Sequence, residues 1–302
     1  MKEDPVTLRE AIQLYINEIK CYASPRTIEY YQENLKKFSD YVETSEGVPF
    51  IEDVFLSDIT RNNFVSYIQW LRIKKLKNVS INTYTRAVRV FSNWLVENNY
   101  IEKSFANVKK LRDDSQIVYP LTDSQAGIII NYLSGNPIFG RRNITIFYLM
   151  LDCGLRLQEV IGLDITDIKK NSLLIRNSKY NKSRMVPLPG FVEYSLDLVK
   201  EGRSSGPVFL TGSGERITKS AITKVFTNIK KNTGIYVHPH LLRHTFATSF
   251  VAGGGNLEIL RLLMGHSDYN ITQRYLHIAA QITITGENIY KLDKVFFRNY
   301  NN

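Results

Sequence analysis

The 302-residue sequence contains little cysteine: Cys21 and Cys153 lie far apart and outside any metal-ligand spacing. We interpret both as reduced thiols in a reducing compartment. No apolar run approaches the ~20 residues needed to cross a membrane, and the first ten residues hold no apolar signal region. These absences argue against a secreted or membrane-spanning chain, so we expect a soluble, cytoplasmic protein.

The sequence also lacks the motifs of several enzyme classes. It has no H-E-x-x-H, no paired cysteine ligands, no acidic D-D-E pattern and no P-loop. These absences argue against metal nucleases, acidic-triad transposases and ATP-driven enzymes. We therefore expect no metal site and no cofactor.

Positive charge, in contrast, is abundant. The chain has 39 Lys and Arg against 29 Asp and Glu, a net charge of +10 and a pI of about 9.4, which favours a polyanionic partner. Residues 1–112 carry 17 basic and 14 acidic side chains, a net charge of +3, whereas the remainder carries 22 and 15, a net charge of +7. The second half of the chain is therefore the more basic.

The apolar pattern indicates two domains. Up to about residue 112, apolar residues recur at helical spacing in four stretches, beginning near Leu8, Ile28, Phe64 and Ile81. A polar stretch that ends in proline follows. We expect a helical domain at residues 1–112, a linker at 113–120 and a second domain at 121–302.

The second domain mixes helices with a short hairpin. Thr122 and Gln125 form a capping-box pattern, and a long apolar helix is expected over residues 144–163, with its buried part ending at Gly154. Two short apolar runs, 172–176 and 185–188, flank a polar turn and predict a β-hairpin. Helices are expected again at 191–199 and 220–232.

The stretch from His240 to Tyr275 organises the rest of the chain. Asn256 is a plausible N-cap for a helix through Met264, which would set the position of His266. His240 and Arg243, three residues apart, share one face of a helix.

The residue types in this stretch suit work on phosphate. Arg offers a charged fork that matches phosphate oxygens. His can donate a hydrogen bond or move a proton near neutral pH, and Tyr can hold a covalent intermediate. Any one of these residues alone is more often structural, so the argument depends on the constellation.

Three motifs in this stretch resemble those of the tyrosine recombinase (phage integrase) family. They are HLLRHTFAT, LMGHS and a tyrosine nine residues after His266. Met264 stands where that family usually has Leu. The resemblance assigns catalytic roles to His240, Arg243, His266 and Tyr275.

Two further motifs complete the set that the resemblance implies. GLRLQEVIGL resembles the first arginine box and gives Arg156, with Glu159 as an acid that holds Arg or His in place. NSKYNKSRMVPL resembles the β-hairpin turn of the family, and the resemblance places Lys179 as the catalytic lysine. Ser178 and Tyr180 replace the two usual glycines there.

The resemblance also implies a fold and a partner. The fold is mainly α with a small β-sheet: an N-terminal helical core-binding domain and an α+β catalytic domain. The partner is a double-stranded DNA recombination site. We expect backbone contacts from basic residues, the alternative being a solvated face; they are Lys74, Lys75, Lys77, Arg86, Arg89, Lys182 and Arg184.

The implied activity is site-specific recombination through a 3′-phosphotyrosyl intermediate, without metal or ATP. With a first helix from about residue 7, no arm-type domain is expected before it, which favours a compact Xer-like or transposon-type enzyme. Two alternatives stay open: a topoisomerase that uses the same tyrosine chemistry, and a catalytically weak DNA-binding regulator.

The tail after Tyr275 separates these alternatives. We expect a short extended break at 283–286 and a helix over 287–300 with an apolar face. In the family such a helix docks on a neighbouring protomer in a tetramer on DNA; the alternative is packing on its own domain. A helix exchanged between protomers favours the recombinase.

Overall fold

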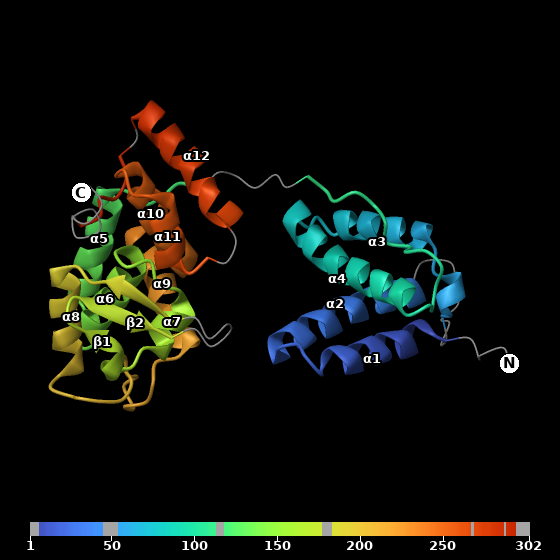
Figure 1. Ribbon diagram of the computed structural model, residues 1–302, viewed down its shortest axis with the longest axis horizontal. Coiled ribbons are helices and arrows are strands. Elements are labelled where there is room, and N and C mark those ends of the chain that lie inside the picture. Colours follow the sequence, from blue (N-terminus) through green and yellow to red (C-terminus); the bar gives the residue numbers. More distant parts are fainter. Residues whose placement is uncertain are drawn as a thin grey trace. The chain divides into compact units, whose positions relative to one another are not determined.

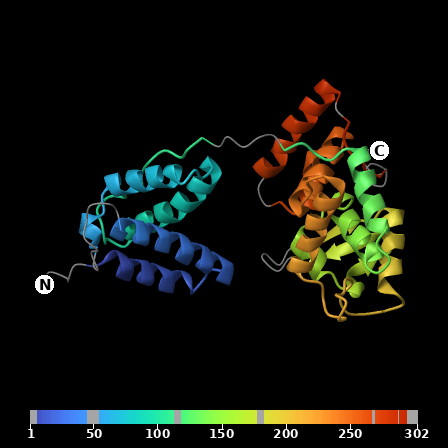
Figure 2. The same ribbon diagram turned by 180° about the vertical axis from the view of Figure 1, so that it is seen from behind.

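The computed structural model describes residues 6–44, 54–112, 118–176, 183–266, 269–286 and 288–293; for residues 270 and 271 it describes the backbone alone. The chain divides into two compact units, Met1–Ile117 and Val118–Asn302 (Figures 1 and 2). Within the described ranges, no helix is both long and apolar enough to span a bilayer.

The first unit is built from helices that pair side by side (Figure 1). They are α1 (Leu8–Ile19), α2 (Pro25–Thr44), α3 (Arg61–Ile73) and α4 (Asn78–Glu97), with a 3₁₀ turn at Leu56–Asp58. The helical prediction is confirmed, and α4 begins at Asn78, three residues before Ile81. Thr7 starts α1 with a reciprocal capping box to Glu10, which satisfies amide groups that a helix start leaves without partners.

Aromatic rings fill the core of this unit. Phe38 packs edge-on against Tyr67 with ring centroids 5.2 Å apart, and stacks on Phe105 at 5.9 Å. Tyr15 contacts Phe91 and Trp94 in the same edge-on manner. Such pairs add to the stabilisation that their buried area gives, so the unit has its own core.

The second unit combines helices with a small antiparallel sheet. Its elements are α5 (Asp123–Ser134), α6 (Gly140–Leu151), α7 (Leu157–Gly162), β1 (Ile168–Lys169), β2 (Ser172–Ile175), β3 (Arg184–Pro187), α8 (Gly190–Lys200), α9 (Lys219–Thr233), α10 (Pro239–Ala252), α11 (Leu257–Met264) and α12 (Tyr269–Thr285). The strands lie in the order β1-β2-β3. The predicted hairpin pairs Leu173 with Val186 and Ile175 with Arg184, and the predicted fold class is confirmed.

The single long helix expected over 144–163 is wrong. The structure has two helices, α6 and α7, separated by a turn at residues 152–156. Gly154 in that turn has φ +64°, and a Cβ there would lie 2.5 Å from the ring of Phe246. Only glycine fits this backbone and this close approach, so the helix breaks where a long-range contact requires it.

The expectations for the tail are also wrong where the structure describes it. Residues 283–285 are not extended but form the last turn of α12, and residues 288–293 are not helical. Instead Tyr290 packs on its own unit: its amide donates to the carbonyl of Leu121 at 2.8 Å, and its hydroxyl donates to Asp152 at 2.8 Å. The remaining residues of the expected helix lie outside the described ranges.

Candidate active site

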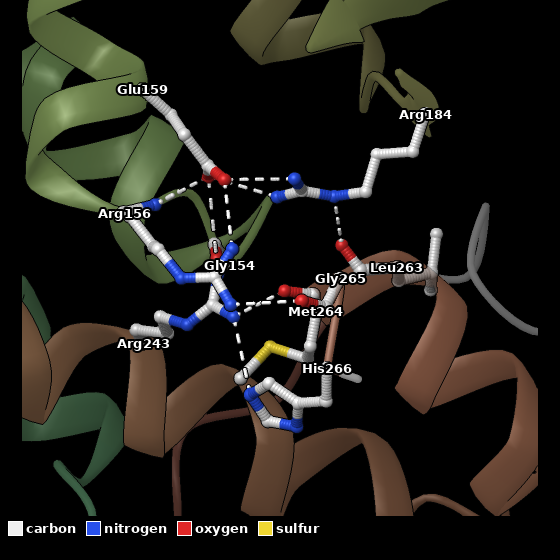
Figure 3. A network of polar contacts seen from close by, with 9 residues as sticks. All are labelled: Gly154, Arg156, Glu159, Arg184, Arg243, Leu263, Met264, Gly265 and His266. Atoms are coloured by element: carbon white, nitrogen blue, oxygen red, sulfur yellow. Dashed lines mark hydrogen bonds and ion pairs between the residues drawn. The ribbon is translucent and has the colours of Figure 1, made fainter. Parts of the chain in front are cut away.

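The C-terminal end of α11 is the point around which the site is arranged (Figure 3). Its last carbonyls have no partner within the helix, and they lie at the negative end of the helix dipole. Three successive carbonyls accept hydrogen bonds from three arginines: Leu263 from Arg184 at 2.6 Å, Met264 from Arg243, and Gly265 from Arg156 at 3.0 Å. One helix end thus fixes three guanidinium groups that come from distant parts of the sequence.

Glu159 holds the same arginines from the opposite side (Figure 3). Its carboxylate accepts two hydrogen bonds of 2.8 Å from Arg184 and one of 2.9 Å from Arg156, and lies 4.0 Å from Arg243. Burial by itself would raise the pKa of Glu159, but these cations and the amide of Arg156 lower it to about 2. Glu159 is therefore a carboxylate at neutral pH.

Arg243 is the most deeply buried of the three arginines. Its side chain is 7% exposed, against 37% for Arg156. It donates to the carbonyl of Gly154 and to that of Met264, so it joins the turn after α6 to the end of α11. Burial, with repulsion from Arg156, lowers the pKa of Arg243 to about 9, and the group is still a cation at neutral pH.

His266 follows directly and is placed by the same helix end. Gly265 ends α11 with φ +60°, and a Cβ there would lie 3.1 Å from the guanidinium of Arg184. Nε2 of His266 lies 3.3 Å from Nη2 of Arg243, and Nδ1 lies 3.0 Å from the hydroxyl of Thr272. Arg243 has no acceptor to offer, so Nε2 accepts from it and Nδ1 carries the proton of the neutral ring.

The pKa of His266 agrees with a neutral ring. Burial lowers it, and the cations Arg243, Arg156 and Arg184 lower it further, to about 4. At pH 7 the site therefore holds three cations and one carboxylate. That net positive charge suits an anionic oxygen near His266.

Tyr275 lies on α12, the helix that packs against α10 and α11. Its ring is half-buried against the apolar cluster of Phe246 and Phe250, 5.4 Å from the ring of His244. Burial raises the pKa of Tyr275, whereas nearby arginines, Arg243 first among them, lower it. The structure thus brings the predicted nucleophile within the electrostatic reach of the arginine cluster.

The two histidines beside Arg243 have different surroundings. His240 is exposed in the first turn of α10. His244, to which no role was assigned, has the ring that faces Tyr275, and its Nε2 lies 2.7 Å from the carbonyl of Val118. Because a carbonyl only accepts, Nε2 of His244 carries the proton and Nδ1 is the acceptor nitrogen.

The basic residues predicted to contact DNA fall into three groups. Lys74, Lys75, Lys77 and Arg86 are exposed in the first unit. Arg89 instead points inward: it donates to the hydroxyl of Thr85 at 3.1 Å and to the carbonyl of Val108 at 3.3 Å, and burial lowers its pKa. Its guanidinium is partly buried and two of its donors have partners within the first unit, so these donors are not turned to solvent as those of the exposed lysines are.

The third group belongs to the hairpin. Arg184, expected on the DNA surface, lies in the site, where Glu159 and Leu263 occupy its donors. Its position directly after a basic turn gave no signal of this role, because its partners lie 25 and 79 residues away. Lys179 and Lys182 lie outside the described residues.

The donor set determines what this site can hold. In the part of the chain that the structure describes, no group of three or more His, Cys, Asp and Glu could bind a metal ion. Three guanidinium groups, a neutral histidine and a half-buried tyrosine instead form a site suited to a phosphodiester. This donor set, on a mainly helical fold with a small sheet, is of the kind that suits phosphoryl transfer to a tyrosine.

Comparison with known proteins gives the family. The model described as "Phage integrase family" matches residues 120–281, and the model described as "Phage integrase SAM-like domain" matches residues 7–111. The chain belongs to the phage integrase family and is a tyrosine recombinase.

Relatives and solved structures agree with this assignment. The chain is 26% identical to "Tyrosine recombinase XerC" of Oceanobacillus iheyensis, over 88% of this chain and 92% of the relative. It is 26% identical to "Tyrosine recombinase XerD" of Halalkalibacterium halodurans, over 88% and 91%. The Tn1549 transposon integrase in complex with transposon right end DNA has the same fold, with a TM-score of 0.74 and 17% identity over 93% of this chain and all of that one.

Proposed function

We propose that this chain cuts and rejoins DNA at specific sites with Tyr275 as the nucleophile. The phenolic oxygen attacks a backbone phosphorus, a 3′-phosphotyrosyl bond forms, and the bond from phosphorus to the 5′ oxygen breaks. The 5′ oxygen takes up a proton and leaves as a hydroxyl. Attack by a 5′-hydroxyl reverses these steps and rejoins the strand, so no ATP is required.

The arrangement of the arginines carries this proposal. Arg156 and Arg243 would neutralise the non-bridging oxygens of the reacting phosphate. A guanidinium has five N–H donors, and the hydrogen bonds described for Arg156 use two of them. Its side chain is also the most exposed of the three arginines, so it can meet an oxygen without leaving Gly265. Donors fixed in advance need little reorganisation during the reaction.

His266 and the proton carriers complete the mechanism. For His266 to donate to the phosphate, Nε2 must carry a proton, and the negative phosphate favours this because it raises the pKa of the ring. His240 is our candidate to accept the proton of Tyr275, and Lys179 is the candidate to protonate the 5′ oxygen. His244 is a second candidate acceptor, because its ring is the one that faces Tyr275.

The first test concerns the nucleophile. A DNA site with a nick near the cleavage position traps the covalent adduct, because the released fragment diffuses away. The wild-type chain should form a protein–DNA band on a denaturing gel, and Tyr275→Phe should form none while it binds the site with unchanged affinity.

A matched control is available on the same helix. Tyr269 starts α12 and is exposed, so Tyr269→Phe makes the same chemical change away from the arginines. This variant should form the adduct at the wild-type rate. An adduct that persists in Tyr275→Phe would falsify the assignment of the nucleophile.

DNA binding is proposed to involve both units. The exposed lysines 74, 75 and 77 would contact the backbone from the first unit, and the basic turn of the hairpin would do so from the second. We also propose that the DNA-binding domain ends at residue 112 and that the catalytic domain begins at residue 121. We also propose that the protein acts in the cytoplasm, where its DNA substrate would be found.

Assembly is proposed to be a tetramer on two DNA sites, with the tail exchanged between protomers. A head-to-tail contact that closes into a ring suits such an assembly. In the described structure the tail docks on its own unit, with the amide of Lys291 donating to Asp123 at 2.9 Å and Tyr290 bound to Leu121 and Asp152. The same three acceptors on a neighbouring protomer offer the tail equivalent hydrogen bonds.

Removal of the tail tests this assembly. A chain that ends at residue 286 should bind and cleave a single site but join two sites poorly, because the exchanged contact is missing. Native gels with two labelled sites measure synapsis directly. If the shortened chain recombines two sites as well as the full chain, the tail serves only its own domain.

A further inference from the structure

Arg184 occupies a position in the site that its place in the sequence does not suggest. It is the first residue of β3, the strand that follows residues 177–182, and its side chain is only 11% exposed. Nη1 and Nη2 each donate to Glu159 at 2.8 Å, while Nε donates to the carbonyl of Leu263 at 2.6 Å. All three nitrogens of the guanidinium are therefore engaged within the protein (Figure 3).

We propose that Arg184 is a positioning residue for strand cleavage, which joins Glu159 to the end of α11 so that Arg156, Arg243 and His266 are aligned before DNA arrives. The inference rests on the proposed function of this site. In this role the side chain of Arg184 contacts other residues of the protein and does not contact DNA. The phosphate is bound by neighbours that Arg184 holds in place.

The contacts of Glu159 show why this role is needed. Glu159 lies close to three cations, and it also accepts from the backbone amide of Arg156 at 2.8 Å, where α7 starts. A carboxylate with so many donors could turn toward any of them. The two parallel hydrogen bonds from Arg184 define the plane of the carboxylate, and Arg156 then meets one fixed oxygen.

The contact with Leu263 extends this alignment to the histidine. Leu263, Met264 and Gly265 are successive residues, so a shift of the Leu263 carbonyl also moves the acceptors of Arg243 and Arg156. His266 is the next residue. One side chain on β3 therefore links α7 to the helix end that places the phosphate-binding groups.

Lysine cannot replace Arg184 in this position. A guanidinium carries Nε and the two terminal nitrogens in one plane, so it reaches the carbonyl and both carboxylate oxygens together. An ammonium is a single point with no fixed plane. Arg184→Lys thus keeps the charge and removes the geometry, which separates the two contributions.

The test compares Arg184→Lys and Arg184→Met with the same changes at Arg216. Arg216 is a matched control because it also joins a carboxylate to carbonyls: it donates to Asp164 at 2.5 Å and to Ile161 at 3.0 Å, near the other end of α7. Each full-length variant is assayed for adduct formation on the nicked site, for affinity at several salt concentrations and for the His266 pKa by NMR.

Arg184→Lys should slow cleavage by about 10- to 100-fold, the range typical of residues that orient a reacting group. Its affinity for DNA and the salt dependence of that affinity should stay unchanged. Arg184→Met should in addition raise the His266 pKa, because one of the cations that lower it is gone. The Arg216 variants should show none of these changes.

A double variant adds a second measure. Glu159→Gln removes the carboxylate that Arg184 orients, so Arg184→Lys should slow cleavage much less in that background than in the wild type. If the loss of cleavage rate in the double variant equals the product of the losses in the two single variants, the two residues act independently. That result overturns the proposal.

Two other outcomes also overturn it. Cleavage by Arg184→Lys at the wild-type rate would show that charge alone is sufficient. A salt slope lowered by about 0.9, the loss of one phosphate contact, would show that Arg184 binds DNA. Failure of the wild-type chain to form an adduct would instead reject the proposed function, and the NMR measurement would still report on the Arg184 contacts.

Discussion

The two units of this recombinase differ in how far their basic side chains are exposed to solvent. The first unit keeps Lys74, Lys75 and Lys77 exposed, and its partly buried Arg89 has protein partners. The second unit gathers three arginines around a single carboxylate, and one of them, Arg243, is almost fully buried.

This difference separates binding from chemistry. Exposed charges attract a polyanion, and salt weakens that attraction, but they are not fixed in space. Buried charges require partners because their desolvation is costly, and those partners fix their geometry. We therefore expect the first unit to govern affinity and its salt dependence, and the second to govern the rate of the chemical step.

The largest effect should come from the buried arginine. Arg243→Lys keeps a cation but cannot reach Gly154, Met264 and the phosphate together. Cleavage should fall by about 10²- to 10³-fold, as when one fixed donor to a reacting oxygen is removed. Single-turnover adduct formation at saturating protein measures the rate, with affinity expected to change little. A large loss of affinity at an unchanged cleavage rate would reverse the roles of the two units.

A smaller effect is expected from the exposed lysines. Replacing Lys74, Lys75 and Lys77 together by Gln should weaken binding and lower the slope of log affinity against log salt by up to about 0.9 per lost contact. Cleavage at saturating protein should be unchanged. Affinity measured between about 50 and 200 mM salt checks this prediction. An unaltered slope would mean that these lysines face solvent and do not contact DNA.

The smallest effect should come from Arg89. Arg89→Met removes hydrogen bonds to Thr85 and Val108 and should lower the free energy of unfolding of the first unit by about 1–2 kcal/mol. The salt slope should stay the same, because Thr85 and Val108 hold the partly buried guanidinium within the first unit. Urea unfolding followed by Trp fluorescence reports on this unit, since Trp70 and Trp94 both lie in it. A lowered slope at full stability would restore Arg89 as a DNA contact.

Local chemistry made much of the fold predictable. Asn256 caps α11 and Thr122 caps α5, as their spacing to the following residues indicated. The hairpin was also visible, because a polar turn separates its two apolar runs. These signals act over a few residues, which a reading of the sequence can follow.

The features that the sequence did not predict depend on contacts between residues far apart in the chain. The break between α6 and α7 depends on Phe246, and the tail is held by Asp152 and Leu121; all of these contacts join distant residues. The site residues could be named from the family's motifs, but those motifs do not record which partners hold them. The sequence therefore predicts a DNA contact for Arg184, whereas in the structure its guanidinium pairs with Glu159.

The acceptors at the end of α11 have a consequence for how this enzyme tolerates mutation. The three arginines are bound to peptide carbonyls, and a substitution changes side chains but not carbonyls. Positions 263 and 264 can therefore vary among apolar residues that keep the helix in place. Gly265 has no such freedom, because of its φ of +60° and the guanidinium 3.1 Å from any Cβ. We therefore expect apolar substitutions to be tolerated at positions 263 and 264, and no substitution to be tolerated at position 265.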